Sequence, residues 1–178
     1  MEIEIRSGQD LRAASQGRLE GYAAVFNAPS HDLGGFREII RAGAFRRTLA
    51  DAKHVRALYD HDSRQVLGRV GANTLRLRET DAGLFFELDL PPTTYAKDLS
   101  ALVERGDVSG CSFAFRVREN GERWNRTDSG LTRELLDVEL SEITITANPA
   151  YPDTTVAKRS MPTPGNANTM RLWLETCR

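Results

Sequence analysis

The stretch that decides the fold class reads Arg105-Gly-Asp-Val-Ser-Gly-Cys-Ser-Phe-Ala-Phe-Arg-Val-Arg118. After two glycines that interrupt regular structure, apolar residues alternate strictly with small or polar ones, and this period of two predicts a β-strand. One face of the strand carries Cys111, Phe113, Phe115 and Val117. The other face carries Ser112, Ala114 and Arg116. The phenylalanine face is expected in the core, so Ser112 points away from the core and Cys111 points into it.

Short segments of the same kind recur along the chain. Strands are predicted over 2–6, 18–26, 36–40, 55–59, 66–70, 74–79, 84–90, 112–118 and 131–146, with a polar loop over 60–64 and a tight turn at Asn120-Gly121. Helices are predicted over 42–50 and from a cap at Thr93 or Thr94 to Gly106. Many short strands and two helices indicate an α+β, mainly β fold, expected to be a small barrel or a folded-over sheet.

Composition excludes several classes of function. The chain has 178 residues, 24 Lys+Arg against 25 Asp+Glu, and a net charge of −1, which indicates one main domain and leaves no basic field for nucleic acid. It contains no apolar run long enough for a membrane span and no signal-peptide pattern at the start, so a cytoplasmic protein is expected. Three histidines and two cysteines without metal-ligand spacing predict neither a metal site nor a cofactor.

The composition changes after Pro152, where the chain becomes polar and rich in proline. We therefore expect a folded domain over 1–158 and a mobile tail over 159–178. The tail ends in Met170-Arg-Leu-Trp-Leu-Glu-Thr-Cys177, an apolar patch that suggests a docking segment or a self-cleavage site, with an inert terminus as the alternative.

Three residues on or beside different strands carry candidate chemistry. His61 follows an apolar strand, Ser112 lies on the outward face of its strand, and Glu142 lies on the polar face of Glu142-Ile-Thr-Ile-Thr146. A serine hydroxyl needs a base to take its proton, an imidazole suits that task, and a carboxylate fixes the imidazole tautomer. Each residue alone is more commonly an ordinary surface or strand residue, and Asp137 and Glu139 compete with Glu142.

Four segments in order resemble one known family. They are Gly43-Ala-Phe-Arg-Arg-Thr-Leu49, Leu58-Tyr-Asp-His-Asp62, Gly106-Asp-Val-Ser-Gly-Cys-Ser-Phe-Ala-Phe115 and Glu142-Ile-Thr-Ile-Thr-Ala-Asn-Pro-Ala-Tyr-Pro-Asp-Thr154. Together they resemble the prohead, or capsid maturation, proteases of tailed bacteriophages. The resemblance implies a herpesvirus-protease-like β-barrel with a few flanking helices. It also implies a serine endopeptidase with Ser112 as nucleophile, His61 as base and Glu142 as third member of the triad.

The resemblance further implies partners and a location. The substrates would be the scaffold or the scaffolding segment of the major capsid protein, and often the enzyme itself, inside the immature prohead in the bacterial cytoplasm. A homo-oligomer is compatible with this reading. Two alternatives are a catalytically decayed assembly factor of the same fold and a cysteine-nucleophile hydrolase that uses Cys111. Arg116 and Arg69 are unassigned candidates for the oxyanion hole.

Overall fold

The computed structural model describes residues 3–15, 17–127 and 130–147, so the expected tail over 159–178 lies outside the described residues. The described part is mainly β, as expected from the short alternating segments. Its strands are β1 (Glu4–Ser15), β2 (Arg18–Val25), β3 (Phe36–Ile40), β4 (Arg56–Tyr59), β5 (Asp62–Arg69), β6 (Leu75–Glu79), β7 (Gly83–Asp89), β8 (Gly110–Val117), β9 (Glu122–Thr127), β10 (Gly130–Leu135) and β11 (Val138–Thr146). The helices are α1 (Arg46–Ala50), the 3₁₀ turn η1 (Val70–Ala72) and α2 (Thr94–Arg105).

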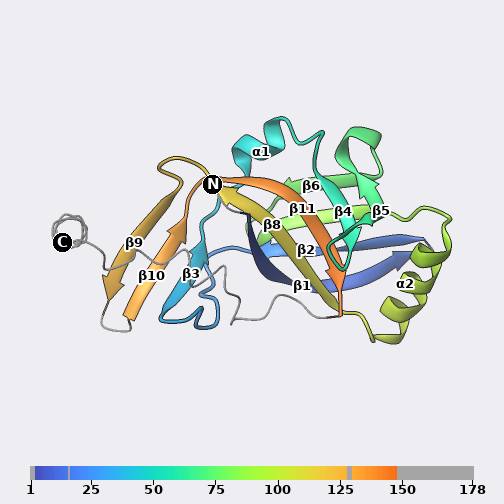
Figure 1. Ribbon diagram of the computed structural model, residues 1–178, viewed down its shortest axis with the longest axis horizontal. Helices are drawn as coiled ribbons and strands as arrows, with labels where there is room; N and C mark the ends of the chain where they lie inside the picture. Colours follow the sequence, from blue (N-terminus) through green and yellow to red (C-terminus); the bar gives the residue numbers. More distant parts are fainter. Residues whose placement is uncertain (1–2, 16, 128–129, 148–178) are drawn as a thin grey trace.

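The strands form two sheets (Figure 1). Eight strands lie in the order β5-β4-β11-β8-β1-β2-β7-β6, and three lie in the order β3-β10-β9. Within the described residues the order of the larger sheet is open, with β5 and β6 at opposite ends, so of the two expected forms it is the folded-over sheet and not a closed barrel. The alternation of apolar and polar residues along each strand fixes which faces are buried. Closure of the sheet into a barrel depends instead on pairing between distant edge strands, which this alternation does not encode.

Strand β1 joins the two halves of the large sheet. Its residues 4–8 pair antiparallel with β8, and its residues from Gln9 to Ser15 pair with β2. Side chains from both halves, among them Phe86 on β7 and Phe113 on β8, belong to one buried apolar cluster. The sheet therefore folds over on itself and encloses a single core, which is the folded-over form of the expected architecture.

Both helices pack at the sheet but differ in detail from expectation. Helix α1 is shorter than the predicted segment 42–50 and is tied to β11, where the Thr48 hydroxyl donates to the Val138 carbonyl at 2.8 Å. Helix α2 buries Ala96, Leu99 and Val103, and it ends at Gly106 with a φ of 82°, the left-handed cap that the sequence predicts. Thr93 occupies the N-cap position, as the sequence predicts, but its hydroxyl makes no capping bond.

The predicted strand 131–146 is two strands in different sheets. The backbone N–H groups of Leu136 and Asp137 both donate to the Gly121 carbonyl, and this contact turns the chain between β10 and β11. Strand β9 was not expected, because Trp124 is the one large apolar residue in its sequence Glu-Arg-Trp-Asn-Arg-Thr. The small sheet lies at one end of the molecule and α2 at the other (Figure 1).

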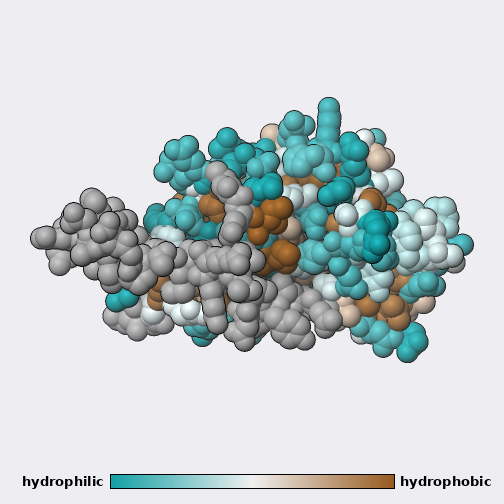
Figure 2. Space-filling model, viewed as in Figure 1, coloured by the Kyte–Doolittle hydropathy of each residue, from teal (hydrophilic) through white to brown (hydrophobic). Residues whose placement is uncertain are grey.

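The surface of the described part is largely polar. Figure 2 shows mainly hydrophilic residues on the visible face, with smaller apolar areas between them. Among the described residues, no helix combines the length and apolar character that a membrane crossing requires.

Candidate active site

Ser112 lies on a central strand of the large sheet. Strand β8 is flanked by β11 and β1, and Ser112 is opposite Thr144 on one side and Ser7 on the other. Cys111, Phe113 and Phe115 belong to the core cluster, as the alternation predicts, which directs Ser112 to the other face. That face is also covered, because Ser112 is 0 % exposed. Its hydroxyl donates to the Arg6 carbonyl at 2.7 Å, a main-chain contact from β1 for which the sequence has no signal.

A β-bulge aims Glu142 at the same face. Leu140 pairs with Phe115, whereas Glu142 pairs with Ala114, so Ser141 is an extra residue in β11. Without this bulge, Leu140 and Glu142 would share a face, because side chains alternate along a strand. With it, Leu140 and Ile143 both reach the core while Glu142 lies on the opposite face, which it shares with Ser112.

His61 lies in a two-residue hairpin turn rather than in the predicted longer loop over 60–64. Tyr59 pairs with Asp62, so β4 and β5 are joined by Asp60 and His61 alone. Both turn residues have positive φ, 47° and 57°, as a type I′ turn requires at its two central positions. Glycine or asparagine is usual there, and a larger side chain in this region costs roughly 1–3 kcal/mol. Such strain at a candidate catalytic histidine is a further sign of a functional position.

The three predicted residues meet in one hydrogen-bonded series. Glu142 Oε1 lies 2.8 Å from His61 Nδ1, and His61 Nε2 lies 3.3 Å from Ser112 Oγ. A carboxylate at Nδ1 accepts the Nδ1–H and leaves Nε2 free to receive the serine proton. The serine hydroxyl is closer to the Arg6 carbonyl than to the imidazole, so the base contact is the longer of its two contacts, as is common in unliganded sites.

The competing candidates lie elsewhere or have the wrong chemistry. Burial raises the pKa of the Cys111 thiol to about 12, which disfavours the thiolate that a cysteine nucleophile needs. The Asp137 carboxylate is bound by Arg47 at 2.7 Å, and the Arg69 guanidinium donates to the Lys53 carbonyl at 3.0 Å. Among the described residues no His, Cys, Asp and Glu side chains group as metal ligands.

Two side chains that the sequence did not single out contact the triad. The Arg56 guanidinium lies 3.9 Å from Glu142 Oε2, because Arg56 is opposite Glu142 in the parallel pairing of β4 and β11. The Thr144 hydroxyl accepts the His61 backbone N–H at 2.9 Å and donates to the Leu58 carbonyl at 3.0 Å. The alternation of β11 places Thr144 on the face of Glu142, but only the strand pairing brings it to the histidine turn.

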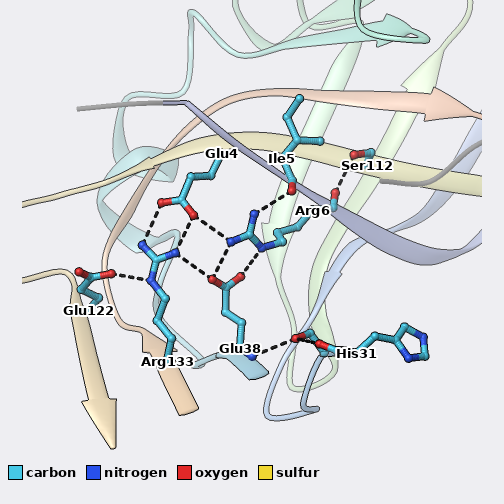
Figure 3. A network of polar contacts seen from close by, with 9 residues as sticks. Glu4, Ile5, Arg6, His31, Glu38, Ser112, Glu122 and Arg133 are labelled. Atoms are coloured by element: carbon cyan, nitrogen blue, oxygen red, sulfur yellow. Dashed lines mark hydrogen bonds and ion pairs between the residues drawn. The ribbon is translucent and has the colours of Figure 1, made fainter. Parts of the chain in front are cut away.

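A buried charge cluster holds the strand that contacts Ser112 (Figure 3). Arg6 binds Glu4 and Glu38, and Arg133 binds both of those carboxylates as well as Glu122. The contacts connect β1 with β3, β9 and β10, so they fix the small sheet against the end of β1. The Arg6 carbonyl that accepts from Ser112 belongs to a residue whose side chain is anchored in this cluster.

A serine, an imidazole and a carboxylate in hydrogen-bonded series are the arrangement that serine hydrolases use. Residues 1–166 of the chain match the family described as caudovirus prohead serine protease, and the chain belongs to that family. The family that the four sequence segments resemble is thereby confirmed. The chain is also 33 % identical over 122 residues to the prohead protease of Enterobacteria phage HK97, an alignment that covers 67 % of this chain and 49 % of that protein. The aligned part thus spans about half the length of that relative. No solved structure matches.

Proposed function

We propose that this protein is a serine endopeptidase of phage capsid maturation with Ser112, His61 and Glu142 as its catalytic triad. The observation that carries the proposal is the series from Glu142 Oε1 through the imidazole to Ser112 Oγ, with steps of 2.8 Å and 3.3 Å. Family membership and the relative's name, prohead protease, support the same class of reaction.

In the proposed mechanism the Ser112 hydroxyl first turns from the Arg6 carbonyl to His61 Nε2. Ser112 Oγ then attacks the carbonyl carbon of the scissile peptide bond while Nε2 takes the hydroxyl proton. The imidazolium then gives this proton to the leaving amine, and an acyl-enzyme forms on Ser112. A water molecule, deprotonated by His61, hydrolyses the acyl-enzyme. Glu142 holds the ring in the required tautomer and stabilises the imidazolium. Since Ser112 is fully buried, a substrate carbonyl reaches Oγ only after the site opens locally.

The substrates proposed are the scaffold or the scaffolding segment of the major capsid protein, and the protease itself. Cleavage would take place inside the immature head, in the cytoplasm of the bacterial host, by a domain that spans 1–158 and acts alone or as a homo-oligomer. The likeness to the herpesvirus assembly protease is part of the same proposal, and superposition of the two large sheets with the same strand order would support it.

The test is co-expression with the capsid protein encoded beside this protease, with cleavage followed by gel electrophoresis and intact mass. We expect Ser112→Ala and His61→Ala each to abolish cleavage, because each removes a member of one cooperative unit. Cys111→Ala is the matched control, since it changes the neighbouring residue on the core face and should keep most turnover per folded molecule.

Activity in Ser112→Ala together with loss in Cys111→Ala would assign the nucleophile to Cys111. Assembled heads that contain uncleaved protein in the presence of wild-type protease would favour the non-enzymatic assembly factor.

A further inference from the structure

The backbone of the His61 turn is held to β11 by one main-chain contact and one side-chain contact. Asp60 and His61 both direct their backbone N–H groups at the end of β11. The Asp60 N–H donates to the Ile145 carbonyl at 3.1 Å, and the His61 N–H donates to the Thr144 hydroxyl at 2.9 Å. The first contact is main chain to main chain, so any residue can provide it. The second requires a hydroxyl at position 144.

The hydroxyl of Thr144 uses both of its roles. It accepts from His61 and donates to the Leu58 carbonyl at 3.0 Å, so it links the turn to the strand that enters it. Thr144 is 0 % exposed, which means that water does not replace either contact. It is also the residue of β11 directly opposite Ser112. Thr144 therefore connects the backbone of His61, the proposed base, to β11, the strand that pairs with the strand of Ser112, the proposed nucleophile.

The turn needs this contact because its backbone conformation is unfavourable. Positive φ at two consecutive non-glycine residues persists only where surrounding contacts determine it. The imidazole projects from the second of these residues, so a change in its φ moves both ring nitrogens relative to Glu142 and Ser112. Misplacement of a catalytic group by about 1 Å costs on the order of 100-fold in rate.

We propose that Thr144 is a positioning residue that holds the His61 backbone in its left-handed conformation and so keeps the imidazole between Glu142 and Ser112. The inference rests on the proposed function. It concerns the hydroxyl of Thr144 and not the packing of its methyl group, so valine, which has the same shape without the hydroxyl, is the informative replacement.

The experiment measures labelling of Ser112 by a fluorophosphonate, identified by peptide mass. In this reaction Ser112 Oγ bonds to phosphorus, fluoride leaves and His61 takes the hydroxyl proton, so the rate reports activation of the nucleophile without a peptide substrate. We expect Thr144→Val to lower the limiting rate constant per folded molecule by about 10–100-fold. Thr144→Ser, which restores the hydroxyl, should recover most of the rate.

Thr48→Val is the matched control. The Thr48 hydroxyl also donates to a strand carbonyl, that of Val138 at 2.8 Å, and accepts a strand N–H, that of Leu140 at 3.1 Å. It is 2 % exposed and does not touch the triad. A similar loss of stability with an unchanged labelling rate is expected for Thr48→Val, and it separates a positioning effect from simple destabilisation.

Each outcome decides one of the two proposals. Wild-type labelling at Ser112 with an unchanged rate in Thr144→Val overturns the positioning role alone. Absence of wild-type labelling at Ser112 overturns the proposed function and this inference with it. If Thr144→Val does not fold, hydrogen exchange of the His61 amide in the wild-type protein gives the answer. Protection of this amide supports the contact, and exchange as fast as that of an exposed amide refutes it.

Discussion

Replacement of Glu142 by glutamine tests the charge at the end of the triad. The carboxylate lies 2.8 Å from His61 Nδ1, so an imidazolium and the carboxylate have their charges about 4 Å apart. At an effective dielectric constant of 20 this attraction is about 4 kcal/mol, which corresponds to about 10³ in rate. The imidazole side chain is 28 % exposed, and solvent screening brings the expected loss to about 10²–10³-fold.

Arg56 increases the effect of this replacement. It lies 3.9 Å from the second carboxylate oxygen and repels an amide NH₂ group placed there. It therefore favours the amide orientation in which NH₂ faces Nδ1. That orientation selects the imidazole tautomer that carries its proton on Nε2, which cannot accept the serine proton. A wrong tautomer costs about 10⁴-fold in a well-studied serine protease. We expect Arg56→Ala to recover part of the activity that Glu142→Gln loses.

The assay is the fluorophosphonate labelling rate of Ser112 per folded molecule. Glu139→Gln is the control, because it makes the same chemical change on the same strand and should leave the rate unchanged. The reasoning is refuted if Glu142→Gln keeps more than about a tenth of the wild-type rate, since that corresponds to less than 1.4 kcal/mol. An equal loss in Glu139→Gln would transfer the role to Glu139.

Three further outcomes are expected. In a Cys177→Ser background, Cys111 should resist iodoacetamide in the folded protein up to about pH 9 and react after unfolding, because its raised pKa of about 12 keeps the thiol protonated. Rapid reaction of Cys111 in the native state would contradict its burial. Arg133→Met should lower the free energy of unfolding by about 3–5 kcal/mol in urea titration, since it removes one of the two arginines that neutralise the buried Glu4 and Glu38 carboxylates, and a loss below 1 kcal/mol would contradict this account. Gly83→Ala should destabilise by roughly 1–3 kcal/mol in the same titration, because its Cβ would clash with the Ala24 carbonyl oxygen. Wild-type stability of this variant would show that the β2 backbone moves aside without cost.

Alternation along single strands made the strand of Ser112 predictable. The phases of Cys111 and Ser112 follow from residues 111–117 alone and agree with the buried cluster. The face of Glu142 follows from the same rule applied to Ile143 and Ile145. The sequence did not indicate the bulge at Ser141, because a bulge is recognised only against the register of its partner strand.

The histidine turn and the strand order depend on contacts between distant segments, which local sequence patterns do not reveal. His61 is unusual at the second position of a two-residue turn, where glycine is preferred, and the conformation of the turn depends on contacts from Thr144 and Ile145 more than 80 positions later. The open order of the large sheet depends likewise on which distant strands pair at β1. Local patterns therefore predicted the elements and the faces, and long-range pairing decided how the site is assembled.

The pairing of β1 has a consequence for synthesis of the chain. Strand β1 contacts β8, whose residues follow about a hundred positions later, and His61 and Glu142 meet only after β11 has inserted between β4 and β8. Contacts of such long sequence separation form late in folding. A nascent chain that ends before Glu142 has neither the acid nor the strand that supports the histidine turn. On the proposed function, the growing polypeptide stays incapable of proteolysis until nearly the whole described domain has left the ribosome.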